Sequence, residues 1–361
     1  MINSMPASKY AHGGDVYSHK GSVLDFSSNI NPLGLPSGVK KAIVDNIDRY
    51  AVYPDPHCRE LSSAIAAHHK IPCSWVINGN GAADLIFRIA LCLKPKRALI
   101  PVPTFSEYEK ALDLVGCDVQ KHRLQENHSF LLGEDFLDQI KKGIDILFIC
   151  NPNNPTGATT DKELMLRISD RCLKCGTILV ADECFLGFCD EEHRLTVMSE
   201  LKKNPNVILL KAFTKTYAMA GIRLGYALSS NNTLMEGIKT TLQPWSVSTV
   251  ASKCGVAALN EVDYIRKTKT LTRENREHLA SSLRDLGIIV FEAAANYILF
   301  KAQRRDLETA FLEHGVLVRS CSNFEGLSDF FYRIAVRSKE DNQYLIECLK
   351  KIMEEKRCPS C

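Results

Sequence analysis

Short apolar runs alternate with amphipathic segments over about residues 50–245, and this alternation constrains the fold more than any other feature. The apolar runs, which are rich in β-branched residues, are predicted strands. They cover Trp75–Ile77, Arg97–Pro101, Ile144–Cys150, Ile178–Asp182, Val207–Lys211 and Leu224–Leu228. The predicted helices between them are Gly81–Leu93, Phe105–Val115, Asp161–Lys174 and Met198–Lys203. Strands that alternate with helices predict an α/β fold with a mainly parallel sheet covered on both faces.

The sequence pattern changes after the Pro244–Trp245 turn, which predicts a second domain. A helical stretch runs to Leu286, and shorter elements follow it. These are predicted strands at Ile288–Phe291, Tyr297–Lys301, Val316–Arg319 and Phe331–Val336, and a last helix at Lys339–Glu355. We therefore expect a large domain over 50–245 and a smaller α+β domain that combines 1–49 with 246–361.

Charge and hydropathy exclude several classes of partner. The formal net charge is only +3, and lysines and arginines are scattered, so neither a nucleic acid nor a membrane surface is an expected partner. The chain has no apolar run of membrane-spanning length, and its first residues have no signal-peptide core. We therefore predict a cytoplasmic protein that acts on a small molecule.

The chain has 14 cysteines, which we expect to be reduced thiols in that compartment. Two pairs, Cys172 with Cys175 and Cys358 with Cys361, have the spacing of zinc ligands. The first pair lies in a predicted helix and the second in the terminal tail. We therefore expect no metal, with a zinc site from the two pairs as the alternative.

The clearest chemical signal is a lysine just after a predicted strand. Lys215 follows the run Val207–Lys211 by four residues, and Arg223 stands eight residues further on. Ligands bind at strand ends in sheets of this kind. A lysine amine can form a Schiff base with an aldehyde cofactor, and an arginine can bind its phosphate with two parallel hydrogen bonds. The alternative is an exposed surface lysine without a chemical role.

Three further motifs stand where the same cofactor would need them. A glycine-containing turn opens a helix and exposes backbone N–H groups to a phosphate. It consists of Gly79, Asn80, Gly81 and Ala82. If the aldehyde cofactor has a hydroxylated pyridine ring, three side chains suit that ring. Asp182 ends a buried strand and is predicted to keep the pyridine nitrogen protonated. Asn154 is predicted to donate to the ring hydroxyl, and Phe105 to stack on the ring. Each motif alone also fits a plain turn or a structural side chain.

Together these motifs resemble the class I and II aminotransferase superfamily of pyridoxal-phosphate (PLP) enzymes over nearly the whole chain. The resemblance implies PLP as cofactor, a seven-stranded, mostly parallel sheet, and a homodimer with active sites at the subunit interface. It gives Lys215 and Asp182 catalytic roles and adds Thr214 and Tyr53 to the cofactor-binding residues. Tyr53, in the sequence Tyr-Pro-Asp-Pro, would reach the cofactor phosphate of the other subunit.

Segments near both ends of the chain resemble one branch of that superfamily, the threonine-phosphate decarboxylases of cobalamin biosynthesis. These segments are His12–Asp15, Asp25–Gly34, Val318–Leu327 and Tyr332–Arg337. The resemblance implies that the substrate carboxylate and phosphate are bound by Arg333, Arg319, Asn31, Asn154, Arg337, His12, Gly13 and Gly14. Several guanidinium groups suit a substrate with two anionic groups.

Two residues depart from the superfamily pattern. Ala212 stands where relatives often have a serine or threonine that contacts the cofactor phosphate, and Thr214 would partly replace it. Phe185 stands where aminotransferases have a tyrosine that meets the ring hydroxyl, which leaves Asn154 as the main partner. The second change fits the decarboxylase pattern.

The expected activity is decarboxylation of a small phosphorylated α-amino acid. L-Threonine O-3-phosphate would give (R)-1-amino-2-propanol phosphate and CO₂. Serine phosphate or a phosphonate amino acid such as phosphonoalanine are alternative substrates, and a histidinol-phosphate aminotransferase is the alternative enzyme. A non-catalytic binding module is disfavoured, because Lys215, Asp182, Asn154 and Arg223 are all present.

Overall fold

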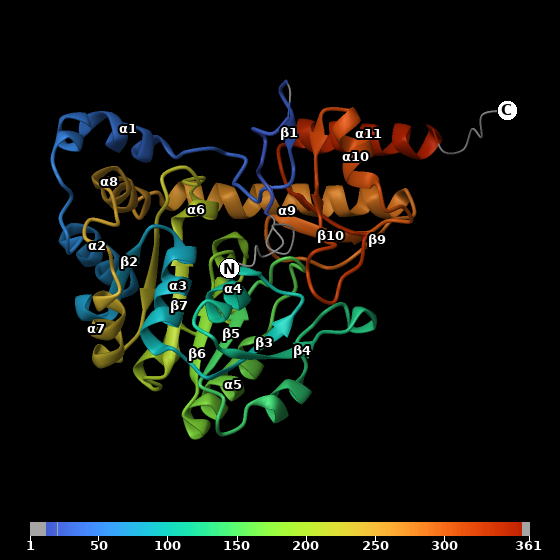
Figure 1. The fold of residues 1–361 in the computed structure, drawn as a ribbon. Helices are drawn as coiled ribbons and strands as arrows, with labels where there is room; N and C mark the ends of the chain where they lie inside the picture. Colours follow the sequence, from blue (N-terminus) through green and yellow to red (C-terminus); the bar gives the residue numbers. More distant parts are fainter. Residues whose placement is uncertain (1–11, 20, 356–361) are drawn as a thin grey trace, which may run out of the picture.

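The computed structural model describes residues 12–19 and 21–355, and within them the central feature is a seven-stranded sheet (Figure 1). Its strand order is β2-β8-β7-β6-β5-β3-β4. The strands are β2 (Val76–Gly79), β3 (Arg97–Val102), β4 (Asp118–Arg123), β5 (Ile146–Cys150), β6 (Ile178–Asp182), β7 (Val207–Ala212) and β8 (Gly225–Leu228). Strand β8 runs antiparallel to both of its neighbours, and the other six strands run parallel to one another. The predicted mainly parallel α/β sheet is therefore confirmed.

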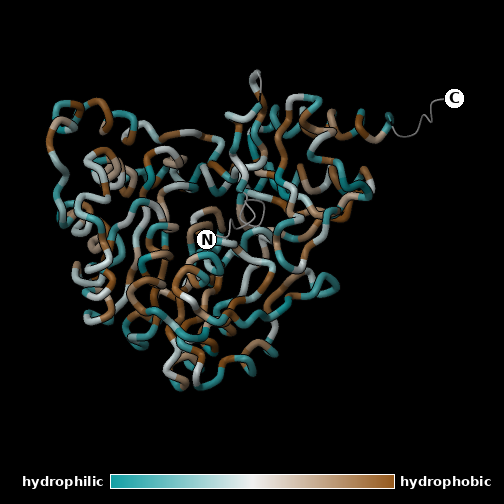
Figure 2. Tube along the Cα trace, in the orientation of Figure 1, coloured by the Kyte–Doolittle hydropathy of each residue, from teal (hydrophilic) through white to brown (hydrophobic). Residues whose placement is uncertain are grey.

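Helices cover both faces of this sheet because strand side chains alternate between the faces. The covering helices are α2 (Arg59–His69), α3 (Ala82–Leu93), α4 (Glu107–Asp113), α5 (Lys162–Cys175), α7 (Asn232–Thr240) and α8 (Thr249–Ala258). Phe148 points to a core with α3 and α7, whereas its neighbours Leu147 and Ile149 point to a core with α2, α5 and α8. Figure 2 shows hydrophobic residues along these strands and hydrophilic ones on the outer loops.

A smaller sheet is built from the C-terminal part of the chain. It has the order β12-β13-β10-β9, and the first strand, β1, pairs separately with β11. The bounds are β1 (Leu24–Asp25), β9 (Ile289–Val290), β10 (Tyr297–Lys301), β11 (Val316–Leu317), β12 (Arg319–Ser320) and β13 (Phe331–Ala335). Helices α10 (Leu307–Glu313) and α11 (Lys339–Glu355) accompany it. The predicted strand Val316–Arg319 is thus divided between two sheets.

The long helix α9 (Val262–Asp285) connects the two parts and runs across the molecule (Figure 1). The N-terminal segment also contacts both, because β1 pairs with β11 whereas Val39 of α1 (Ser37–Asp45) packs into the same core as Ala251 of α8. Among the residues described, no helix is long and apolar enough to cross a membrane.

The remaining helical segments are short. They are α6 (Phe213–Thr216) and the 3-10 turns Ile47–Ala51, Cys73–Trp75, Glu126–His128, Glu134–Gln139, Leu186–Phe188, Glu192–Arg194 and Met198–Lys202. The last of these replaces the α-helix predicted at Met198–Lys203. Cys172 is buried on α5 and the Cys175 thiol contacts the Ile140 carbonyl oxygen at 3.5 Å, while Cys358 and Cys361 lie outside the described residues.

Candidate active site

A cavity of about 360 Å³ lies at the carboxyl ends of the parallel strands. Asp182 is the last residue of β6, and Lys215 and Asn154 follow the ends of β7 and β5. The cavity brings together many of the predicted site residues. These are His12, Gly13, Ala82, Phe105, Asn154, Asp182, Thr214, Lys215, Arg223, Arg319 and Arg333. Strand ends of an open α/β sheet are the expected place for a ligand.

Lys215 sits in the single turn of α6 that follows β7. Burial lowers the pKa of its amine to about 8, and the positive charges of Arg333 and Arg223 act in the same direction. Among the described residues no carboxylate forms an ion pair with it. About a tenth of this amine is therefore neutral and nucleophilic at pH 7, far more than of an ordinary lysine.

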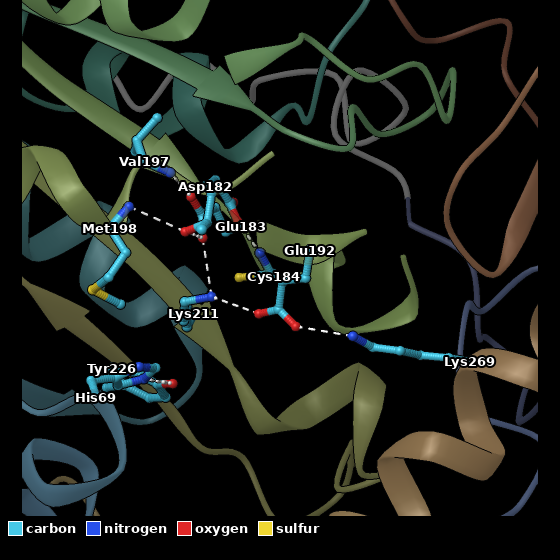
Figure 3. Close-up of polar contacts among 11 residues, drawn as sticks. His69, Asp182, Glu183, Cys184, Glu192, Val197, Met198, Lys211, Tyr226 and Lys269 are labelled. Carbon is cyan, nitrogen blue, oxygen red and sulfur yellow. Dashed lines mark hydrogen bonds and ion pairs between the residues drawn. The ribbon is translucent and has the colours of Figure 1, made fainter. Parts of the chain in front are cut away.

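A second lysine, four residues earlier, is held in the opposite state (Figure 3). Lys211 Nζ lies 3.0 Å from Glu183 Oε2 and 3.5 Å from Glu192 Oε1. Burial alone would lower the pKa of Lys211, but the two carboxylates outweigh it and raise the pKa well above the ordinary value. Glu192 also pairs with Lys269 of α9 at 3.2 Å. This network borders a separate cavity of about 240 Å³, so Lys215 is the lysine of the pair that lines the main cavity.

Close backbone packing forms a cradle at one end of the main cavity. Gly81 has a φ of +87°, and a Cβ there would lie 2.8 Å from an Arg223 guanidinium nitrogen. A Cβ on Gly225 would lie 2.5 Å from the backbone nitrogen of Ala82. The two glycines thus let Arg223 and the N-terminus of α3 meet, with Thr214 also in the cavity wall. This end of the cavity suits a phosphate.

The other residues of the predicted turn help to hold this cradle in place. Gly79 pairs with Gly225 across β2 and β8, and the Asn80 backbone N–H donates to Asp84 at 2.8 Å. Ala82 is the member of the turn that reaches the cavity wall.

Asp182 is held by two donors, one of which the sequence analysis missed. Its carboxylate is 4% exposed and accepts from the backbone N–H of Cys184 at 2.9 Å. The hydroxyl of Tyr108, on α4, donates to its other oxygen at 2.6 Å. Burial and the nearby Asp182 charge raise the pKa of Tyr108 well above its ordinary value, so Tyr108 remains a donor. The carboxylate is therefore fixed in orientation at the cavity wall.

Two arginines define the opposite end of the cavity. Arg319 on β12 and Arg333 on β13 are direct cross-strand partners, and both are buried. Arg333 donates to Asn154 Oδ1 and, at 2.9 Å, to the Ser27 carbonyl oxygen. Its Nε is buried without a hydrogen-bond partner among the described residues. Arg319 donates to Asn323 at 2.7 Å and lies over the Phe324 ring. Such a pair suits an anionic ligand.

The other predicted substrate residues serve the scaffold in this structure. Arg337 donates to the Asp25 carbonyl oxygen at 3.0 Å and to Asp341 at 2.9 Å. The Asn31 amide donates to Thr216 and Thr268, both at 2.7 Å. Neither side chain is among those lining the cavity.

Tyr53 lies away from the cavity of its own chain. It is 76% exposed and its ring stacks on Trp245 with a centroid distance of 4.3 Å. A role of Tyr53 in the site of another subunit stays a prediction.

Both departures from the superfamily pattern line the cavity. Ala212 closes β7 beside Thr214, and Phe185 contacts Tyr297 edge-to-face at 4.9 Å. The Tyr297 hydroxyl donates to the Asn153 carbonyl oxygen at 2.7 Å. Phe185 therefore gives the cavity an apolar wall next to Asp182.

Comparisons with known proteins find similar enzymes over nearly the whole chain. Threonine-phosphate decarboxylase from Salmonella typhimurium is 37% identical over 353 residues, which cover 95% of this chain and 96% of that protein. Histidinol-phosphate aminotransferase from Symbiobacterium thermophilum is 32% identical and covers 92% of this chain and 91% of its own. The crystal structure of L-threonine-O-3-phosphate decarboxylase from Porphyromonas gingivalis matches with a TM-score of 0.82 and 25% identity, over 91% of this chain and 99% of that one.

The family profile of aminotransferase class I and II matches residues 21–349, nearly all of the chain described above. PLP is the cofactor of this family, as the motifs around Lys215 and Asp182 predicted. The chain belongs to the class I and II aminotransferase family of PLP-dependent enzymes.

Proposed function

We propose that the protein decarboxylates a small phosphorylated α-amino acid, with L-threonine O-3-phosphate as substrate and (R)-1-amino-2-propanol phosphate and CO₂ as products, in cobalamin biosynthesis. The observation that carries this proposal is the cross-strand pair Arg319 and Arg333, which borders the same cavity as Lys215. Two guanidinium groups suit a substrate with both a carboxylate and a phosphate.

The residues of the cavity fit PLP. Arg223, Thr214 and the N-terminus of α3 would hold its phosphate, in the space that the glycines at 81 and 225 leave free. Asp182 would accept a hydrogen bond from the ring nitrogen, and Phe105 would stack on the ring. When bound, PLP supplies an electron-withdrawing ring that is conjugated to the substrate amine.

The protein side chains would then orient the bond that breaks. Arg319 and Arg333 would hold the anionic groups and so fix which bond at Cα is aligned for cleavage, and alignment of the bond to the carboxylate favours loss of CO₂. The departing carboxylate must be replaced at Cα by a proton. Lys215 Nζ can carry that proton, because its pKa of about 8 lets it both accept and donate near neutral pH.

The alternative is an aminotransferase that acts on histidinol phosphate, supported by the 32% identity to the Symbiobacterium enzyme. The two activities differ in the bond broken at Cα and in the need for a keto-acid co-substrate. We would incubate the holoenzyme with threonine phosphate, serine phosphate, phosphonoalanine and, with 2-oxoglutarate, histidinol phosphate. CO₂ release from a phospho-amino acid is expected. Faster glutamate formation from histidinol phosphate would overturn the proposal.

We also propose that the enzyme is a cytoplasmic homodimer in which Tyr53 completes the partner's site. In support, Tyr53 has two exposed apolar neighbours, Val52 next to it in the chain (67% exposed) and its stacking partner Trp245 (45%), and Ile47 (64%) lies six residues before it in the chain. Lys215→Ala and Tyr53→Ala proteins should each have low activity. When the two variants are unfolded together and refolded, mixed dimers should regain activity, because one site then has both residues. No recovery in a verified mixed dimer would contradict a shared site.

A further inference from the structure

A buried carboxylate that the sequence analysis did not predict lies in the cavity wall beside His12. Glu107, the first residue of α4, is 6% exposed, and its Oε1 lies 2.8 Å from Nε2 of His12. Its Oε2 lies 3.5 Å from Nζ of Lys110. Burial raises the pKa of Glu107, but His12 and Lys110 outweigh this and lower it overall. Glu107 is therefore a carboxylate at neutral pH, at the wall of a cavity suited to anions.

The segment that carries His12 is packed closely against the end of the cavity that Arg319 and Arg333 define, which we call the substrate end. A Cβ on Gly13 would lie only 2.3 Å from the carbonyl oxygen of Ser27, so glycine is required there. The Gly14 backbone N–H donates to Ser27 Oγ at 2.7 Å. The same Ser27 carbonyl oxygen accepts from Arg333. One residue thus holds both the His12 segment and a predicted substrate arginine.

The contact with Glu107 determines what His12 can offer a ligand. When the imidazole carries both protons, its Nε2–H is donated to Glu107 and its Nδ1–H remains for another acceptor. A buried carboxylate beside an anionic ligand is unfavourable unless cations accompany it, and Lys110 together with an imidazolium at His12 would provide that positive charge. The 6.0 Å distance between the His12 and Phe105 rings places the imidazole next to the predicted stacking residue.

We propose that Glu107 is a positioning residue that orients His12, so that the Nδ1–H of His12 donates to the phosphate of the substrate. Glu107 acts through His12 and does not contact the substrate itself. The proposal rests on the proposed function in one respect, that the substrate carries a phosphate. The aminotransferase alternative shares this property.

The test compares Glu107→Gln, His12→Ala and the double variant as holoenzymes. We would measure kcat and KM for CO₂ release from O-phospho-L-threonine, and the Kd of inorganic phosphate by calorimetry. Glu107→Gln should raise KM and the phosphate Kd about tenfold, with kcat changed less than about threefold, as expected for loss of one charge-assisted contact. The double variant should match His12→Ala within about twofold, because the two residues act as one unit.

Glu109→Gln is the matched control, since Glu109 lies on the same helix but pairs with Lys121 at 2.9 Å. It should leave KM and the phosphate Kd unchanged. Unchanged values in Glu107→Gln, or single effects that multiply in the double variant, would overturn the role of Glu107. If the enzyme transaminates histidinol phosphate and releases no CO₂, the proposed function fails, while the same variants tested with histidinol phosphate and inorganic phosphate still decide the role of Glu107.

Discussion

The two ends of the cavity are built in different ways. The cofactor end uses the ends of neighbouring strands and short local motifs, such as the Gly81 turn and the segment from Lys215 to Arg223. The substrate end draws on distant parts of the chain, with His12 from the N-terminal segment and Arg319 and Arg333 from the small sheet. Arg333 joins the two ends through its hydrogen bond to Asn154.

This difference indicates how one fold can serve two reactions. Most groups at the cofactor end stand on the strands of the large sheet or in the turns that follow them. The substrate end depends on how the small domain and the N-terminal segment meet the sheet, so changes there can alter the substrate without altering the cofactor site. The following predictions test whether one end of the cavity can be changed without affecting the other.

The largest effect is expected at the cofactor end. Lys215→Ala should abolish turnover and remove the absorbance of covalently bound PLP, because Lys215 lines the cavity and its pKa is lowered, whereas the pKa of Lys211 is raised by two carboxylates. Lys211→Arg is the control, since it keeps the charge that pairs with Glu183. Borohydride reduction followed by peptide mapping should place the cofactor on Lys215. A label on Lys211 would contradict the assignment.

Substitution of the two arginines should show whether the two ends of the cavity act independently. Arg319→Ala and Arg333→Ala should each cost about 2–4 kcal/mol in kcat/KM, since both remove a buried charge-assisted contact. Arg333→Ala should also shift the absorbance spectrum of the bound cofactor, because Asn154 loses its donor, whereas Arg319→Ala should not. Equal spectral shifts in both variants would show that the ends are not separable.

The state of Lys215 predicts a pH dependence for cofactor capture. Only the neutral amine attacks an aldehyde, so capture of PLP by the apoprotein should be fast above the pKa of about 8 and should slow by about tenfold for each pH unit below it. Stopped-flow absorbance would measure the rate. A midpoint near the ordinary lysine pKa would mean that burial and the two arginines do not act on this amine in solution.

A smaller effect is expected from Tyr108→Phe. The variant keeps the stacking of the ring on Phe148 but removes the 2.6 Å hydrogen bond to Asp182. Loss of one such bond should cost about 1–2 kcal/mol, seen as severalfold weaker PLP binding and lower kcat. KM for the substrate should change little, because Tyr108 acts at the cofactor end. Tyr344→Phe, which removes a hydroxyl of α11 that donates to the His314 carbonyl oxygen, is a control for hydroxyl loss.

Much of the fold could be predicted from sequence, because buried strands and long helices have a clear hydrophobic pattern. Strand β6, strand β10 and helix α11 have the predicted bounds. Strand β4 was missed because Asp118–Arg123 is a polar edge strand without an apolar run. Helix α5 begins one residue after the predicted start, since Asp161 caps it by accepting from Leu164 N–H at 2.9 Å. The domain boundaries stay a prediction.

The site could be predicted only where a local motif marked it. Lys215, Asp182 and the Gly81 turn follow strands directly, so their position was readable from sequence. Tyr108 and Glu107 were missed because their partners lie 74 and 95 residues away, and both had been assigned only to an amphipathic helix. The roles given to the site residues remain predictions until they are tested.

The register of the small sheet has one further consequence, for stability. It makes Arg319 and Arg333 cross-strand partners, and like charges in such a pair repel. An anion bound near both would relieve that repulsion in the folded chain only, so it shifts the folding equilibrium by RT ln(1 + [L]/Kd). The small sheet is thus more stable with its ligand than without it, and inorganic phosphate alone should raise the melting temperature of this enzyme.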